Sequence, residues 1–333
     1  MQSLRSCGFI LGLMAAVFTA QALAAEQEAS KKPTKPVSRV EQLAPLLDEN
    51  TLVVFRMDVK RIEGAEAFDV LARLFPPPGG FTDKDAVRKQ MQERWKELAD
   101  RGGETLYLVL RIAPGVDDGI IGAIPLMPGV DPAPLLDWLK YLDGQERHRT
   151  EDLVWTTGPK TAAAINSRQA SPRPDFTEAF ASLADAPLQW TMALPDDPRR
   201  VLASFIPELS TELGGESLRQ IATDTKWIAV SGQLGEQARL RIDVRLSNAE
   251  RAQQLSDLLL RLRSVLPTLP AVQQAVPAAD AFFRRQNPQR MEQHVSLEFS
   301  AADSRLLVNQ VLAEQLRIWA ERKANKTESP DER

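Results

Sequence analysis

Three charged residues alternate with apolar ones in the stretch VVFRMDVKR, residues 53–61. In a β-strand, Arg56, Asp58 and Lys60 would share one face, because successive side chains of a strand point to opposite sides. An acid flanked by two bases offers groups that can transfer protons. The same pattern is also typical of a strand with one buried and one solvated face.

The second half of the chain repeats the apolar part of this pattern. In QWTMAL, residues 189–194, the apolar positions recur with their methionine in register. The charged positions do not recur, since threonine and alanine stand where Arg56 and Asp58 stand in the first copy. Positions that face solvent vary in this way. We therefore interpret the charged row as a solvated strand face and not as a catalytic strand.

Histidine is too scarce to support most metal or nucleophile sites. The sequence has only His148, in the charged run GQERHRTED that we expect to be a loop, and His294, in an expected strand. No HExxH, HxH or CxxC pattern is present for zinc, and no GxSxG motif for a Ser-His-Asp site. We predict no metal, no cofactor and no triad.

Pairs of carboxylates can catalyse hydrolysis without histidine, so they need separate consideration. Asp117 and Asp118 precede a glycine in an expected hairpin turn. Asp196 and Asp197 precede a proline, where Asp197 fits a helix N-cap. Because each pair has a sufficient structural role, we assign no catalytic residue. A carboxylate-dependent hydrolase outside the cytoplasm stays as an alternative.

The glycine pairs and the tryptophans have ordinary structural interpretations. Gly-Gly at 79–80, 102–103 and 214–215 fits neither GxGxxG nor a P-loop, so these pairs are expected to end helices. Most tryptophans fall on apolar helix faces or in strands, which predicts core packing rather than sugar stacking. These are Trp95, Trp155, Trp190, Trp227 and Trp319, whereas Trp138 is uncommitted.

The first residues have the layout of a secretory signal peptide. Arg5 precedes an apolar run from Phe9 to Ala20, and Ala22-Leu23-Ala24 follows it. The run is shorter than the roughly 20 residues that a spanning helix needs. We therefore expect residues 1–24 to be removed, no transmembrane segment after cleavage, and a periplasmic or extracellular protein. The only cysteine, Cys7, would leave with the leader, so the mature chain would contain no disulfide or thiolate site.

The charge balance argues against nucleic acid as a partner. The chain has 41 Lys+Arg and 45 Asp+Glu, a net charge of −4. A nucleic-acid binder normally shows a basic excess or a basic stripe, and neither is present.

The period of the hydrophobic residues switches repeatedly between that of strands and that of helices. The expected strands are residues 51–59, 104–112, 119–126, 151–158, 186–194, 225–234, 237–246 and 291–300. The expected helices are residues 61–75, 82–101, 131–142, a helix opening at 197, 208–224, 247–266, 270–286 and a capped helix after 300. In that last helix one face carries Val308, Leu312, Leu316 and Trp319.

These elements predict an α+β protein built from two similar halves. Residues 25–39 are expected to be a flexible linker, 40–185 and 186–323 the two repeats, and 324–333 a disordered tail. Each half follows the order β-α-α-β-β-α-β, with a mainly antiparallel sheet and helices on one face. Whether the halves share one sheet or form two domains is left open by the sequence.

Several phrases resemble a group of uncharacterised exported bacterial proteins with this duplicated layout. They are LAPLLDENTLVVFRMDV, ETLYLVLRI, SPRPDFTEAFASLADAPLQWTMALPDDPRRVL and LSTELGGESLRQIATDTKWIAVSG. The resemblance covers roughly residues 40–320. It implies the fold and an exported location, and it carries no functional residue over.

We therefore expect an exported, non-catalytic protein that binds a protein or another envelope component. A small-molecule or lipid carrier is the other alternative to the hydrolase, and it would need an enclosed apolar cavity of roughly 300 Å³ or more.

Overall fold

The computed structural model describes nine stretches of the chain. They are residues 40–68, 83–112, 119–142, 146–167, 173–183, 185–204, 218–233, 239–268 and 279–303. The expected signal peptide, linker and C-terminal tail lie outside them. So do the expected helical residues 69–75 and 304–323, Asp117 and Asp118, and the glycine pairs at 79–80 and 214–215.

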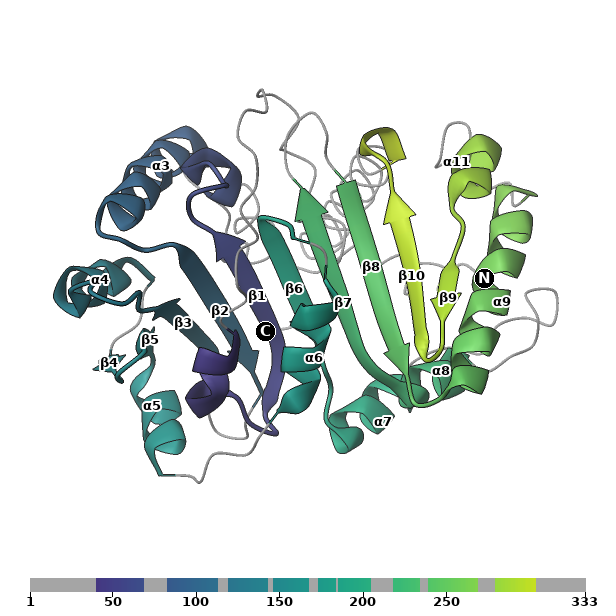
Figure 1. Ribbon diagram of the computed structural model, residues 1–333, viewed down its shortest axis with the longest axis horizontal. Helices are drawn as coiled ribbons and strands as arrows, with labels where there is room; N and C mark the ends of the chain where they lie inside the picture. The colour runs from purple at the N-terminus through teal and green to yellow at the C-terminus, as the bar shows by residue number, and fades with distance from the viewer. Residues whose placement is uncertain are drawn as a thin grey trace, which may run out of the picture.

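One antiparallel sheet contains all ten described strands, in the order β4-β5-β3-β2-β1-β6-β7-β8-β10-β9 (Figure 1). The two parts of the chain thus share one sheet, which answers the question that the sequence left open. The strands are β1 (Thr51–Asp58), β2 (Thr105–Arg111), β3 (Ile120–Pro125), β4 (Glu146–Arg149), β5 (Leu153–Thr157), β6 (Leu188–Met192), β7 (Thr225–Gln233), β8 (Arg239–Leu246), β9 (Gln289–Met291) and β10 (His294–Phe299).

The strand order is the same on both sides of the centre. β1 and β6 are neighbours at the centre. Outward from β1 the order is β1-β2-β3-β5-β4, and outward from β6 it is β6-β7-β8-β10-β9. On both sides the last two strands are thus exchanged relative to their order in the chain. This order agrees with halves that meet between residues 185 and 186. The duplication of the chain itself, and the domain bounds, stay predictions.

Helices cover both faces of the sheet, so the expectation of helices on one face was wrong. We name the faces after two neighbouring residues of β1, the Phe55 face and the Val54 face. The described helices are η2 (Val40–Leu46), α3 (Lys84–Asp100), α4 (Pro132–Trp138), η3 (Leu139–Leu142), α5 (Pro159–Asn166), α6 (Pro174–Ser182), α7 (Asp196–Ser204), α8 (Leu218–Asp224), α9 (Ala249–Val265), η5 (Leu266–Thr268) and α11 (Ala279–Arg285).

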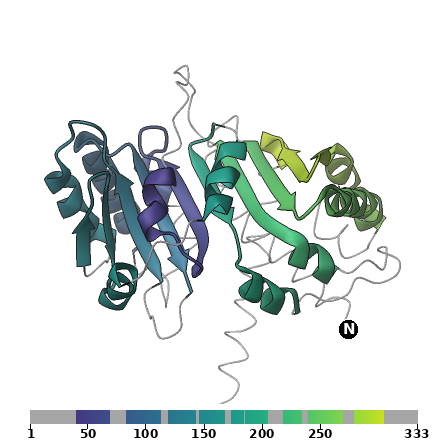
Figure 2. The same ribbon diagram turned by 60° about the horizontal axis from the view of Figure 1, so that its bottom comes forward.

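Each face has its own apolar core. On the Phe55 face, Trp95 of α3, Trp138 of α4 and Phe282 of α11 pack into one cluster with the strands. On the Val54 face, η2, α5 and α6 supply the cover, including Phe176 of α6. Figure 2 shows η2 and α6 side by side over the centre of the sheet. The sequence reasoning missed α5 and α6, two helices of 8 and 9 residues that begin with proline, and therefore missed the second layer.

Three local expectations also need correction. The run around His148 is the edge strand β4 and not a loop, and its alternating charges are typical of an edge strand. The strand expected over 291–300 is the hairpin β9–β10, which reverses at Glu292 with φ 51°. That turn contains no glycine or asparagine, so it carries no sequence signal. The helix expected over 82–101 begins at Lys84, and Asp83 caps it by accepting from Ala86 N.

The tryptophan prediction is confirmed where the structure describes it. Four of the tryptophans expected in the core are described, and their exposed fractions lie between 1% and 7%: Trp95, Trp155, Trp190 and Trp227. Trp138, which the sequence left uncommitted, is 1% exposed, and Trp319 lies outside the described residues. Within the described stretches, no helix combines the length and the apolar character that crossing a bilayer requires.

Candidate functional site

Two of the three charged residues, Arg56 and Asp58, are buried, which overturns their interpretation as a solvated face, whereas Lys60, beyond the end of β1, is exposed as expected. Arg56 is 2% exposed and Asp58 is 7% exposed, because both point to the Val54 face that η2 and α6 cover. The Arg56 guanidinium donates to Gln189 Oε1 at 2.9 Å and to the Ala186 carbonyl at 3.3 Å. Arg56 therefore joins the first half of the chain to the second.

Asp58 lies in this buried cluster without a hydrogen bond from the guanidinium group of either neighbouring arginine. Its Oδ2 is 4.0 Å from Arg56 and 3.9 Å from Arg61, and its Oδ1 accepts the Lys60 backbone N–H at 3.1 Å. Burial raises the pKa of Asp58, and the two arginines and the backbone hydrogen bonds only partly oppose that rise. Arg61 has a second partner in Asp185.

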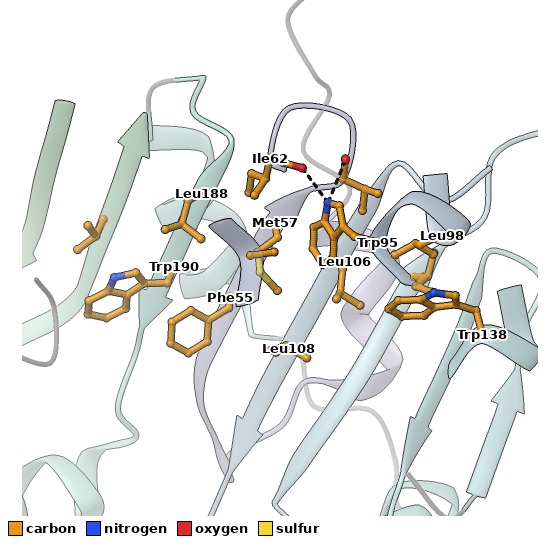
Figure 3. Packing of buried hydrophobic residues seen from close by; sticks show 14 of the residues in the cluster. Phe55, Met57, Ile62, Trp95, Leu98, Leu106, Leu108, Trp138, Leu188 and Trp190 are labelled. Carbon is orange, nitrogen blue, oxygen red and sulfur yellow. Dashed lines mark hydrogen bonds between the residues drawn. The ribbon is translucent and has the colours of Figure 1, made fainter. Parts of the chain in front are cut away.

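On the other face of the sheet, a groove of about 580 Å³ lies between the turn that follows β1 and helix α3. The Trp95 indole N–H donates to the carbonyls of Val59 (3.2 Å) and Ile62 (2.8 Å), which ties the turn to the helix (Figure 3). The groove is lined by Val59, Ile62, Glu63, Gly64, Lys89, Gln92, Glu93, Trp95, Lys96 and Ala99. It thus combines an apolar floor with charged side chains of both signs, two of them carboxylates.

The structure does not bring the two histidines together. His148 lies on the edge strand β4, where it stacks on Trp155 with centroids 4.1 Å apart and lies 3.2 Å from Glu146. His294 lies on β10, near the other edge of the sheet, and its ring centroid is 5.4 Å from that of Trp227. Within the described stretches, no group of three His, Cys, Asp or Glu side chains could hold a metal ion.

The described carboxylate pair has a structural role. Asp196 and Asp197 occupy the first turn of α7 and pair with Arg199 and Arg200 one turn later. The helix begins at Asp196, so Asp197 is not its N-cap as expected. Both carboxylates are well exposed on the helix surface, at 70% and 90%.

The Val54 face is unexpectedly polar in its second half. Asp243 of β8 is 3% exposed and accepts from Arg241 Nε at 2.8 Å and from its terminal nitrogen at 2.9 Å. Ser296 lies opposite Asp243, with His294 two residues earlier on the same strand. Ser296 Oγ donates to the Gln289 carbonyl at 3.5 Å, and no hydrogen bond of the described residues connects these three side chains into a triad.

The Phe55 face carries a row of apolar side chains that are only partly buried. The strand registers make them direct cross-strand neighbours over six strands. This apolar row consists of Ile120, Leu110, Val53, Met192, Ile228 and Val244. Ile120 is 46% exposed, and Ile112, two residues after Leu110, is 69% exposed. The sequence reasoning missed the row because it depends on register, and the sequence alone indicated only that this side of β1 is apolar.

Comparisons with known proteins leave the family open. No family model matches the sequence, and no curated protein sequence matches it. The chain is similar to a solved structure described as "Structure of crystal form I of TP0453". The TM-score is 0.35 and the identity is 10%, over 81% of this chain and 97% of that one. A similarity at this level carries no argument about function.

Proposed function

We propose that this is an exported, non-catalytic protein that binds a protein partner of the cell envelope through its apolar row. The observation that supports the proposal most is the row itself, six apolar side chains in register on one face of one sheet. The signal peptide predicted over residues 1–24 supports export.

Folding leaves part of the apolar surface of the row exposed to water. A partner that covers such side chains gains about 25 cal/mol per Å² of apolar surface removed from water, before the cost of association. Exposed apolar side chains that lie together mark interaction surfaces more often than scattered ones do. Ile120, in the apolar row, and Ile112, two residues after Leu110 of the row, are both well exposed, and we expect them to anchor the partner.

Photo-cross-linking tests the proposal. A photoreactive amino acid would replace Ile112 or Ile120 in the cell, and Val201 of α7, which is 59% exposed, would serve as the matched control. The proposal expects one discrete protein adduct from positions 112 and 120 and none from 201. An equal pattern from all three positions, or adducts to lipid alone, would contradict it, and the lipid result would favour the carrier alternative.

The groove beside α3 supports a second candidate, the carboxylate-dependent hydrolase. Glu63 and Glu93 line the same groove, as a carboxylate-pair mechanism requires. Hydrolysis of cell-wall or glycan substrates by the purified protein, lost in both Glu63→Gln and Glu93→Gln, would establish it. Activity that persists in both variants would exclude this pair.

A further inference from the structure

Four buried carboxylates in the described residues fall into two kinds. Each of the following three accepts at least two hydrogen bonds from one arginine: Asp48 from Arg111, Asp243 from Arg241 and Asp303 from Arg285. Asp58 accepts none from a guanidinium group, since those of Arg56 and Arg61 are 4.0 Å and 3.9 Å away. A bidentate arginine holds each of those three carboxylates in place, whereas the Asp58 carboxylate has backbone hydrogen bonds and the longer-range attraction of two arginines.

The arginines beside Asp58 do not depend on its charge. Arg56 has acceptors in Gln189 and Ala186, and Arg61 has Asp185. Protonation of Asp58 would therefore leave neither guanidinium without an acceptor. Two further charged groups lie close in the strand pairing, Lys60 on the adjoining turn and Glu104 just before β2, and these two pair with each other at 2.7 Å.

Asp58 also supports the turn that forms one wall of the groove. Its backbone carbonyl accepts from the N–H groups of Arg61 and Ile62, at 3.2 Å and 3.1 Å, and its side chain accepts from Lys60. The other side of that turn is bound by the Trp95 indole. A change in the Asp58 carboxyl group is therefore transmitted to the turn over one or two residues.

We propose that Asp58 is a pH switch for the groove: the ionised carboxylate holds the turn after β1, and the protonated form weakens that hold and changes the turn's contact with Trp95. The direction of the pKa shift agrees, because a raised pKa brings protonation into a milder pH range. This inference is independent of the apolar row, which lies elsewhere on the Phe55 face.

The Trp95 indole N–H is the reporter for a test by nuclear magnetic resonance. In the intact protein, its resonance is expected to shift as the pH falls, with a midpoint above 3.8, the ordinary value for aspartate. The Trp138 indole, which donates to the Arg94 carbonyl, is the internal control and should not follow this titration. A parallel shift of both resonances would indicate unfolding and would contradict the switch.

Three variants assign the titration. Asp58→Asn should abolish the Trp95 shift, and Asp58→Glu should move its midpoint, which keeps the test decisive if one of them does not fold. Asp243→Asn, at a buried carboxylate far along the sheet, should leave it unchanged. A Trp95 resonance that does not titrate, or that titrates equally in Asp58→Asn, would overturn the proposal.

Discussion

Phe55 and Trp190 lie directly opposite each other where β1 pairs with β6, with ring centroids 6.1 Å apart and ring planes 34° apart. The two residues belong to different halves of the chain, and both are at least nine-tenths buried on the Phe55 face. The distance is within the range of favourable aromatic pairs. The centre of the ten-stranded sheet is thus an aromatic contact between the halves.

Trp190→Ala is expected to lower the free energy of unfolding by about 3–5 kcal/mol, the usual cost of deleting a buried aromatic side chain. Urea denaturation measures it. Met291→Ala is the matched control, because Met291 is 74% exposed and its loss should cost no more than about 0.5 kcal/mol. A loss below about 1 kcal/mol for Trp190→Ala would contradict a central role for this pair.

The Asp48–Arg111 ion pair supports a second prediction. Their side chains are 1% and 2% exposed, and Arg111 Nε donates to Asp48 Oδ1 at 3.2 Å. Arg111→Met should cost about 3–5 kcal/mol, because it removes the guanidinium group that pairs with a buried carboxylate. In urea denaturation, the double variant Arg111→Met with Asp48→Asn should lose less unfolding free energy than the sum of the losses of the two single variants.

The exposed pair Asp197–Arg200 provides the control for that series. Its side chains are 90% and 68% exposed, so Arg200→Met should change stability by less than about 1 kcal/mol. Equal losses at the two sites would show that burial does not decide the strength of these pairs.

The regular elements were predictable from sequence because their signals are local. Residues 51–59 alternate in the strand period, and residues 247–266 show a helical period, with Asn248 as the observed cap. The burial of Arg56 was not predictable in this way, because it depends on α6, more than a hundred residues later. Gln189, its hydrogen-bond partner, is 133 residues away and carries no signal of its own.

The candidate sites were less accessible to sequence reasoning than the fold. The groove depends on the approach of Trp95 to two carbonyls of a turn, and such a contact leaves no residue pattern. The apolar row depends on the registers of five strand pairs. Periodicity showed that Val53 lies on an apolar strand face, but not that this end of the strand stays partly exposed.

A third prediction concerns pH and His294. Burial lowers the pKa of His294, and the charge of Arg245 lowers it further. The unfolded chain therefore binds a proton more readily than the folded one, so stability should fall as the pH drops from about 7.5 through 6.5 toward the folded pKa. Urea midpoints at pH 7.5 and 5.5 measure this loss, and His294→Gln should reduce it. An identical loss in the variant would show that another group is responsible.

Gly64 carries the fourth prediction, because it lies where the residues after β1 approach α3 closely. A Cβ atom at Gly64 would lie 2.6 Å from Gln92 Cα and 2.6 Å from Trp95 Cβ, so the helix itself would have to move. Gly64→Ala should therefore cost about 1–3 kcal/mol, although alanine normally favours a helix over glycine.

Gly122→Ala is the informative comparison for Gly64→Ala. The new Cβ at Gly122 would meet Leu142 Cδ1 at 2.4 Å, the end of a side chain that can change its rotamer, whereas at Gly64 the obstacle includes backbone. The Gly64 variant should thus lose more stability in urea denaturation, and the Trp95 indole resonance should move in it but not in the Gly122 variant. A Gly64→Ala protein with unchanged stability would mean that the turn and α3 are not held in contact, which would also remove the structural basis of the pH switch.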